Sequence, residues 1–395
     1  MTDEVSGAHS RSGGHHPVRR ARLATAAVFA VHGAVSGSFA TRIPWIQERL
    51  DLRPWQLGLA LCCPAIGAAI AMPLSGRLIH RYGARTVIRW LLALWCAALA
   101  LPALSPGLPW LCVTLLVYGA AGGTADVAMN LHGSLLEQRL GRPVMSNLHG
   151  MWSAGTLIGG AVGAAAAHAA LDARVHLAAV AAVLVLLSQV ACRAVLDHRP
   201  VPGAVAPPAV ALPPASALLI GLVGFCAVFA EGASMDWSGV YLRTVTHSSV
   251  TIAASAYTAF ACTMAVSRFA GNAVIRRLGA TRTVRGGGIV ATAGGAVIVF
   301  APAPWVAVIG FALVGVGISV VVPLTFAAAA RIGPVPSQSI AGVAAIVYAS
   351  GLIAPALIGA IAAATSLTGS FCLVTVLTSV LAPAAGVLRP RGIQL

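Results

Sequence analysis

Long apolar segments alternate with short polar ones along almost the whole chain. Twelve of these segments hold about 19 to 28 residues, and about 20 apolar residues suffice to cross a bilayer as one helix. The expected spans are residues 23–41, 55–79, 86–105, 109–132, 145–168, 174–195, 216–242, 249–275, 283–301, 304–330, 336–363 and 366–388. The pattern predicts an all-α polytopic membrane protein with 12 transmembrane helices.

Composition strengthens this interpretation. Hydrophobic residues make up 58% of the chain and charged residues only 9%, whereas a soluble domain has about 25% charged residues. The net charge is +15, and the chain has no lysine, so every strongly basic residue is an arginine. The positions of these arginines, rather than their number, indicate whether the chain binds nucleic acid or a lipid bilayer.

The arginines collect in alternate inter-helix segments and at the termini. One side holds Arg11, Arg19, Arg20, Arg22, Arg77, Arg81, Arg85, Arg89, Arg139, Arg142, Arg193, Arg199, Arg276, Arg277, Arg282, Arg285, Arg331, Arg389 and Arg391. The other side holds Arg42, Arg49, Arg53, Arg174 and Arg243. Positive residues gather on the cytoplasmic side of membrane proteins, so we expect both termini in the cytoplasm and the chain in the cytoplasmic (inner) membrane. This pattern indicates a lipid bilayer as partner and no nucleic acid.

A proline-rich segment divides the chain near its middle. Residues 198–216 contain six prolines, which is typical of an extended linker rather than a helix. We therefore expect five regions. They are a disordered cytoplasmic tail at 1–22, a six-helix bundle at 23–195, a cytoplasmic linker at 196–215, a second six-helix bundle at 216–388 and a short cytoplasmic tail at 389–395.

The two halves match one another at a constant offset of 196 residues. The matched pairs are Arg81 and Arg277, Gly83 and Gly279, Pro106 and Pro302, Gly119 and Gly315, Gly155 and Gly351, and Gly163 and Gly359. The matches need no gap and fall on residues that punctuate helices. The repeat predicts two pseudo-symmetric bundles with parallel topology.

Neither the cysteines nor the glycine-rich segments indicate a cofactor. The eight cysteines lie in or beside apolar runs without the spacing of a metal site, and the glycines at 286–288 lack the residues of a phosphate-binding loop. We expect no metal, no cofactor and no use of ATP, so a proton gradient is the energy source considered below.

Several segments carry a resemblance to a known family. They are the loop Gly76–Arg85, with the pattern G-x-x-x-[D]-R-x-G-x-R, and the segments ATRIPWIQ at 40–47, DVAMN at 126–130, NLHGMW at 147–152 and EGASMDW at 231–237. From about residue 23 to 388 the chain resembles the major facilitator superfamily. Within it, the chain looks most like the branch of fucose permeases and rhizopine-associated membrane proteins. The resemblance implies a secondary transporter rather than an enzyme, and we expect a monomer.

The resemblance also implies a latch between the two halves at the first basic loop. Its residues would be Gly76, His80, Arg81, Gly83 and Arg85. Physically, the arginines can reach lipid phosphates or the carbonyls at helix C-termini. His80 stands where the family usually has Asp, so either the latch responds to pH or the histidine is a tolerated substitution.

Asp126 is the first candidate for coupling to protons. An ionised carboxylate near the bilayer centre costs roughly 3 kcal/mol, so it must pair, protonate or face water. Gly119, Gly122, Asp126 and Asn130 share one helical stripe that faces a cavity or the protein interior. In fucose permeases an acid at the matching place couples to protons; the alternative is a buried hydrogen-bond partner.

Two further acids lie in the seventh span. Glu231 lies about 22 Å from the cytoplasmic start of the span at 1.5 Å per residue, which places it well inside the membrane. Asp236 is nearer the outer mouth. Both are candidates for proton coupling, and Glu231 alternatively for solute binding.

A set of polar and aromatic residues within the spans is suited to binding a solute. They are Arg42, Asn130, Asn147, His149, Trp152, Trp237, Arg268 and Tyr348. Arginine, asparagine and histidine can bond hydroxyl or anionic groups, and the aromatics can stack on a sugar face. The alternatives are a snorkelling Arg42, a core His149 and aromatics that only pack. Arg268 lies deep in a span and needs an acid on another helix, a helix C-terminus or an anionic ligand.

Taken together, these patterns favour a proton-coupled secondary transporter of a small polar solute such as a sugar or cyclitol, working by alternating access. The main alternative is a proton-driven exporter of a drug or hydrophobic metabolite. A non-transporting membrane sensor or a membrane enzyme fits less well, because the chemical groups are spread over several helices and depths.

Overall fold

The computed structural model describes residues 15–197, 215–248, 250–333 and 335–389. Within these ranges the chain is built of helices and contains no strand. The first half holds α1 (His15–Ala40), α2 (Ile43–Arg49), α3 (Pro54–Ala71), η1 (Met72–Leu74), α4 (Ser75–Tyr82), α5 (Ala84–Ala98), α6 (Leu101–Leu104), α7 (Leu108–Leu140), α8 (Met145–His168) and α9 (Ala173–Cys192). The second half holds α10 (Ala215–Thr244), α11 (Val250–Val299), α12 (Pro304–Ile318), α13 (Val321–Ala329), α14 (Pro336–Ala364), α15 (Leu367–Ser379), α16 (Leu381–Ala384) and η2 (Ala385–Leu388).

The long helices form an all-α polytopic membrane fold. Nine helical segments in the described ranges have the length and hydropathy to cross a membrane. Three further long helical segments are not among those nine. They are α8, with 24 residues, and the two parts of the 50-residue α11, which is divided at Gly279 by non-helical backbone angles. We call each of these long helical segments a rod. Together these make twelve rods, matching the number expected from the hydrophobic pattern.

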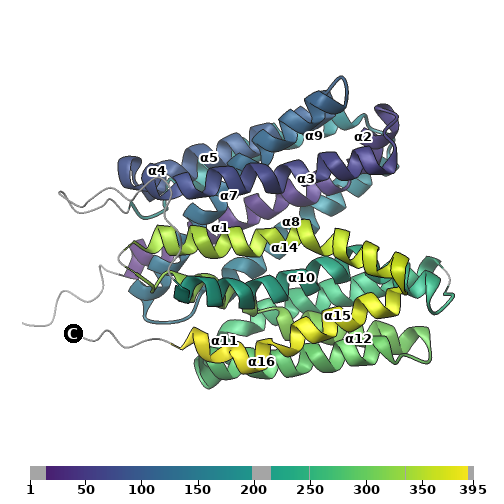
Figure 1. Ribbon diagram of the computed structural model, residues 1–395. Coiled ribbons are helices and arrows are strands. Elements are labelled where there is room, and N and C mark those ends of the chain that lie inside the picture. The colour runs from purple at the N-terminus through teal and green to yellow at the C-terminus, as the bar shows by residue number, and fades with distance from the viewer. Residues whose placement is uncertain (1–14, 198–214, 249, 334, 390–395) are drawn as a thin grey trace, which may run out of the picture.

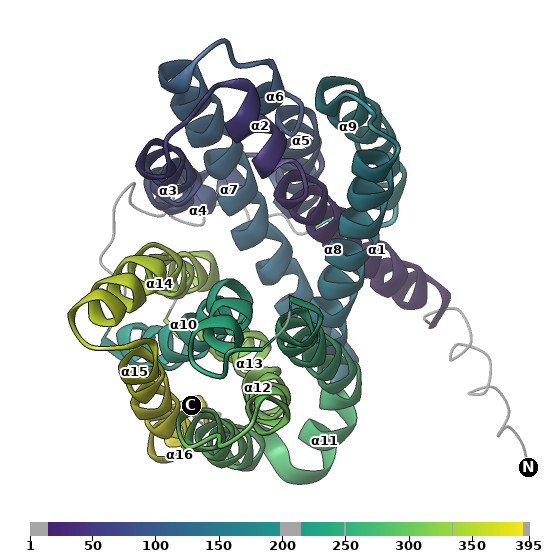
Figure 2. The same ribbon diagram turned by 90° about the vertical axis from the view of Figure 1, so that its right-hand side faces the viewer.

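The rods form two groups that lie side by side (Figure 1). An end-on view places α1 to α9 in one group and α10 to α16 in the other, with α7 and α8 facing the second group (Figure 2). The expected linker lies largely outside the described residues, as do 1–14 and 390–395. The expected boundary between the N-terminal tail (1–22) and the first helix was wrong, because α1 already begins at His15. A helix can extend beyond its membrane-spanning part into polar residues.

The distribution of side chains suits a lipid solvent. Phe300 is 80% exposed and Trp90 is 65% exposed, whereas the polar Asn130 and His132 are fully buried. Large apolar side chains are unfavourable at a surface that faces water. They are stable at a surface that faces lipid tails, which are as apolar as the side chains themselves. The interior is therefore where chemistry must be sought.

Glycine allows α8 to lie directly against α1. A Cβ atom at Gly155 would collide with the carbonyl oxygen of Ala30, and one at Gly159 with that of Ala34. Small residues spaced four apart are known to let membrane helices approach at the backbone. This contact fixes α8, and with it His149 and Trp152, against the first helix.

Gly83 and Gly279 adopt nearly the same unusual backbone conformation. Gly83, between α4 and α5, has φ 80° and ψ 151°, and Gly279, within α11, has φ 76° and ψ 163°. A positive φ strains any residue with a side chain. Two equivalent turns at an offset of 196 residues agree with the internal repeat.

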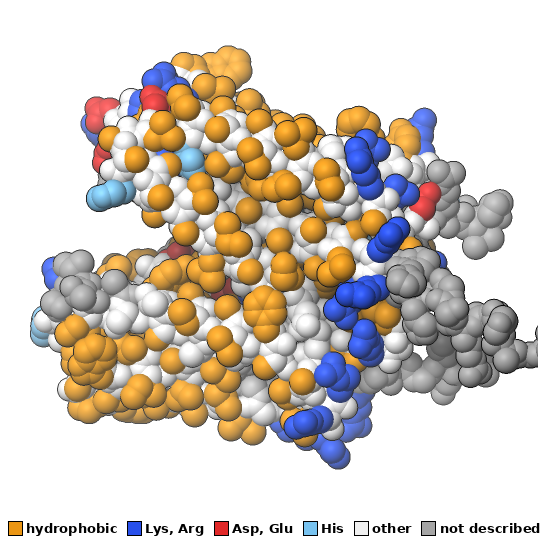
Figure 3. Space-filling view, turned by 180° about the vertical axis from the view of Figure 1, so that it is seen from behind, with side chains coloured by type: hydrophobic (Ala, Val, Ile, Leu, Met, Phe, Trp, Pro, Cys, Tyr) orange, Lys and Arg blue, Asp and Glu red, His pale blue; other side chains and the backbone are white. Residues whose placement is uncertain are grey.

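The two ends of the molecule differ in charge and in shape. Most of the blue arginine side chains gather at one end, which we call the arginine-rich end (Figure 3). At the opposite end the surface is hollowed between the two halves (Figure 3). The helices are thus closed together at the arginine-rich end and spread apart at the other.

Candidate functional site

A cavity of about 430 Å³ lies between the two halves. Helices α1, α3, α5, α7 and α8 line it from one half, and α10, α11, α13 and α14 from the other. Its polar and aromatic side chains are His32, Ser36, Trp95, Asp126, His149, Trp152, Glu231, Arg268, Phe326 and Tyr348. Six of the residues singled out from the sequence therefore meet in one place.

Asp126 holds a buried carboxyl with a neutral partner. The residue lies near the middle of α7 and is 7% exposed. Asn130, one turn further along, donates from Nδ2 to Oδ1 of Asp126 over 3.0 Å. Tyr348, from the other half, lines the same cavity beside this carboxyl. Within the described part of the chain no ion pair involves Asp126, so its charge is not compensated by a cation.

His149 extends this network from α8. Its Nε2 lies 3.1 Å from Oδ1 of Asn130. An amide oxygen only accepts, so Nε2 of His149 carries the hydrogen and donates it. His149 thus orients the Asn130 amide, whose nitrogen faces Asp126. Asn130 itself is fully buried and lies behind the cavity wall rather than on it.

Arg268 forms the charged part of the site. Its guanidinium lies 3.1 Å from Oε1 of Glu231 on α10, and it also donates to Oγ of Ser153 over 2.7 Å and to the carbonyl of Ser319 over 3.3 Å. Arg268 is 4% exposed, and a buried cation requires such a partner. Of the three kinds of partner expected for Arg268, the structure shows an acid on another helix, Glu231.

The contact with Ser153 also joins the halves. Ser153 belongs to α8, whereas Arg268 belongs to α11. The neighbouring Ser146 donates to the backbone carbonyl of Arg268 over 2.6 Å. The ion pair is consequently held in place by hydrogen bonds from the opposite bundle.

Two residues that the sequence did not single out complete the aromatic wall. Trp152 donates from Nε1 to Nδ1 of His32 over 3.1 Å, so Nε2 of His32 carries the hydrogen and faces the carbonyl of Gly122 at 3.3 Å. The His32 ring stacks on Trp95 with centroids 5.2 Å apart. A histidine in an otherwise apolar first span was the available signal for this role.

Four of the predicted residues lie away from the cavity. Arg42 is buried but donates to Nδ1 of His176 over 3.2 Å. Asn147 is exposed and lines a separate pocket described below. Asp236 is exposed outside the cavity lining, and Trp237 packs against the apolar core of the second half. Position along a helix can be read from the sequence, but the rotation that aims each side chain cannot.

The first basic loop lies at the arginine-rich end. Arg85 donates from Nε to the carbonyl of Cys192 over 3.2 Å and from Nη2 to that of Arg193 over 2.6 Å, at the C-terminus of α9. Gly76 is buried, His80 is half-buried, and their helix α4 packs against α14 of the other half. Arg81 is exposed. The loop therefore touches the interface between the halves, and its latch role is still a prediction.

Glu137 makes a second link at this end that the sequence did not indicate. Its Oε2 accepts hydrogen bonds from the backbone N–H groups of Val144 and Met145 at 2.9 and 3.1 Å, at the start of α8. Its Oε1 lies 3.2 Å from Nη2 of Arg331 in the other half. One carboxylate thus caps a helix and ties the halves together.

In the described part of the chain, twelve helical rods in two halves, with a cavity between them that carries several polar side chains, are the architecture of a multi-pass membrane transporter of small solutes. The sequence profile of the Major Facilitator Superfamily matches residues 25–339. The chain belongs to this superfamily, whose members are transporters and not enzymes. An uncharacterised MFS-type transporter of Yersinia pestis is 33% identical over 372 residues, covering 93% of this chain and 96% of the relative. Membrane protein MosC of Rhizobium meliloti is 29% identical over 390 residues, covering 96% and 93%.

Solved structures share the fold at much lower identity. The crystal structure of the transporter FucP in its outward conformation has a TM-score of 0.75 at 15% identity, covering 94% of this chain and 99% of that chain. The proton:xylose symporter XylE, solved with 6-bromo-6-deoxy-D-glucose, has a TM-score of 0.71 at 12% identity, covering 93% and 95%. These likenesses confirm the fold that the sequence resemblance implied.

Proposed function

We propose that the protein is a proton-coupled symporter of a small polar solute such as a sugar or cyclitol. The observation that carries this proposal is the buried carboxyl of Asp126, which lines the cavity between the halves, accepts a hydrogen bond from the neutral Asn130 amide and has no ion-pair partner among the described residues. A lone carboxylate inside a membrane is costly unless it is protonated. Asp126 therefore takes up a proton from one side and releases it when the cavity opens to the other.

The solute is bound by the remaining polar wall. Glu231 is already neutralised by Arg268, so in this conformation the pair presents hydrogen-bonding groups rather than a free acid. Trp152 and Tyr348 offer aromatic faces, and His149 adds a ring nitrogen beside them. Hydroxylated rings combine an apolar face with a polar edge, which suits this mixture. FucP is a fucose:proton symporter and XylE is a proton:xylose symporter, which supports the same chemistry here.

The orientation follows from the arginines. We place the arginine-rich end and both termini in the cytoplasm of an inner-membrane protein, because positive charge collects there. The hollow at the opposite end then faces outward (Figure 3). Movement of the halves about the cavity exposes the same site to the cytoplasm in the second state.

A second candidate is a proton-driven exporter of a hydrophobic compound. The cavity also has apolar lining residues, which include Leu61, Met129, Val228, Met235, Val322, Phe326 and Val347.

Uptake of a panel of sugars and cyclitols into proteoliposomes with an imposed pH gradient tests the main proposal. Accumulation that collapses with the gradient supports it; no uptake together with gradient-driven extrusion of hydrophobic dyes favours the exporter.

A further inference from the structure

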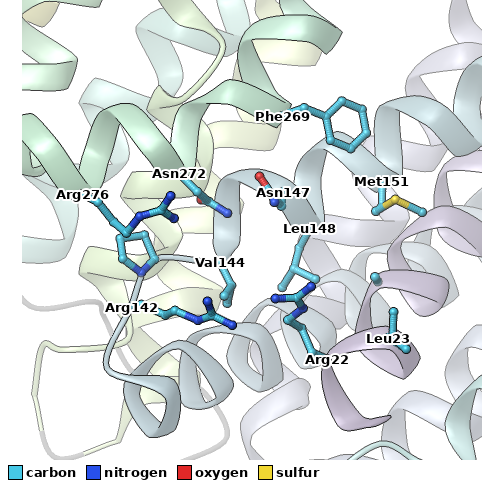
Figure 4. A pocket seen from close by; sticks show the side chains of 12 residues that line it. Arg22, Leu23, Arg142, Val144, Asn147, Leu148, Met151, Phe269, Asn272 and Arg276 are labelled. Atoms are coloured by element: carbon cyan, nitrogen blue, oxygen red, sulfur yellow. The ribbon is translucent and has the colours of Figure 1, made fainter. Parts of the chain in front are cut away.

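A second pocket lies at the arginine-rich end, outside the transport cavity. Its volume is about 210 Å³, and its lining includes Arg22, Arg142 and Arg276, the amide of Asn272 and the apolar side chains of Met151 and Phe269 (Figure 4). Three separate segments each supply one arginine: the start of α1, the turn before α8 and the first part of α11. We call it the arginine pocket.

The arginine pocket has unbalanced positive charge. None of its described lining residues is acidic. The guanidinium groups of Arg22 and Arg142 point toward one another, and Arg276 approaches from α11 (Figure 4). Like charges this close repel one another unless an anion lies between them. Guanidinium groups hold phosphate oxygens through paired, charge-assisted hydrogen bonds.

Asn272 adds an independent sign of a ligand. The residue is 4% exposed, it lines the arginine pocket, and its Oδ1 has no hydrogen-bond partner. A buried amide oxygen without a donor is unfavourable. A ligand with a hydroxyl group beside its phosphate would satisfy both this oxygen and the arginines.

The apolar lining distinguishes a lipid from a free anion. Phe269 and Met151 lie on the side of the arginine pocket away from Arg142 and Arg276 (Figure 4). Leu23 is 56% exposed and Phe269 is 44% exposed, although both belong to membrane-spanning helices. Exposed apolar side chains at this depth face hydrocarbon, which provides a path for an acyl chain.

We propose that the arginine pocket binds the headgroup of an anionic lipid whose phosphodiester carries a hydroxylated alcohol, as in phosphatidylglycerol. The phosphate lies among the three arginines, the headgroup hydroxyl donates to Asn272, and an acyl chain leaves past Phe269. Since Arg22 and Arg142 belong to one half and Arg276 to the other, the bound lipid stabilises the conformation that is closed at this end.

Matched variants test this site without any transport assay. Arg276→Gln removes a lining guanidinium, whereas Arg277→Gln removes the adjacent exposed arginine that does not line the arginine pocket. The purified proteins are titrated in detergent with phosphatidylglycerol, phosphatidylcholine or inorganic phosphate. Retained lipid is counted by native mass spectrometry, and the Tm of each sample is measured.

We expect phosphatidylglycerol to be retained and to raise the Tm of the unmodified protein and of Arg277→Gln. Its affinity for Arg276→Gln should fall roughly tenfold, the loss expected for one charge-assisted hydrogen bond. Arg142→Gln should behave like Arg276→Gln, and Arg139→Gln like the unmodified protein. Equal losses in Arg276→Gln and Arg277→Gln would show only diffuse charge attraction and overturn the site. An equal rise of Tm with inorganic phosphate would overturn the lipid as its source.

Discussion

The guanidinium of Arg268 lies 3.1 Å from the carboxylate of Glu231, and the pair faces the cavity between the halves. Arg268 is also bonded to Ser153 of the opposite bundle. A solute that hydrogen-bonds either member of the pair therefore acts on a contact between the bundles. The proposed binding of solute and the proposed movement of the halves would therefore be linked at this contact.

Glu231→Ala should lower stability as well as transport, because it leaves the buried cation of Arg268 without its acid. Breaking a buried ion pair in this way costs about 3 kcal/mol. The Tm measured in detergent should fall clearly, and uptake should be lost. Glu48→Ala, which removes an exposed acid of α2, serves as the control and should change neither.

The double variant Glu231→Ala with Arg268→Ala separates the two effects. It should regain much of the Tm, since neither charge is left unpaired, while uptake stays absent. A double variant as unstable as the sum of the single variants would argue against the coupling of this pair.

Asp126→Asn should abolish accumulation driven by a pH gradient while leaving solute exchange down a concentration gradient intact. The amide keeps the size of the side chain and can still accept the hydrogen bond from Asn130, but it cannot take up or release a proton. Uptake and counterflow are measured in the same proteoliposomes over a range of pH. Accumulation by Asp126→Asn equal to that of the unmodified protein would remove Asp126 from the coupling mechanism.

Asp172→Asn is the matched control for that experiment. Hydrogen bonds from Arg174 lower the pKa of the Asp172 carboxyl to about 2. Asp172 therefore stays ionised at every pH of the assay and takes up no proton. Its replacement should leave both uptake and the pH profile of uptake unchanged.

The sequence allowed some parts of this site to be predicted and not others. The pairing of Gly83 with Gly279 was accessible because an internal repeat preserves spacing. Asp126 could be predicted as a site residue because it is a single acid in an apolar span. The residues on the same face, such as Gly122 and Asn130, follow from the spacing within one helix. The partner of Arg268 was not, since Glu231 is 37 residues away and their contact depends on how two helices are rotated.

The same limit explains the misplaced residues and the overlooked ones. Arg42 and Asp236 have plausible depths, but Arg42 lies in the turn between α1 and α2 and bonds His176, and Asp236 lies on a face of α10 outside the cavity lining. His32 was overlooked although its ring accepts a hydrogen bond from Trp152, because only the packing of α1 on α8 brings them together. The link from Glu137 to Arg331 spans 194 residues and both halves, which no local pattern reveals.

Gly155→Ala should destabilise the first bundle, because the added methyl group would collide with the carbonyl of Ala30. Overpacking of this kind costs about 1–3 kcal/mol. Gly160→Ala is a close control on the same helix, since no atom lies within 4 Å of a Cβ at that position. The Tm should fall for Gly155→Ala alone; an equal Tm for both variants would contradict the close contact of α1 and α8.

Arg331→Gln should favour opening of the arginine-rich end, because it breaks the ion pair with Glu137 but leaves the cap on α8 intact. Glu137→Gln weakens both contacts and should have the larger effect. The partly exposed pair contributes on the order of 1 kcal/mol, which is enough to shift a balanced equilibrium about fivefold.

Hydrogen exchange of the amides at 144–150, followed by mass spectrometry, should quicken in the order unmodified, Arg331→Gln, Glu137→Gln. Arg139 is exposed near the end of α7, the helix that carries Glu137. Arg139→Gln therefore controls for the loss of a positive charge, and its amides should exchange like those of the unmodified protein. Unchanged exchange in Arg331→Gln would mean that the halves are held closed by other contacts, such as the hydrogen bond from Ser146 to the backbone of Arg268.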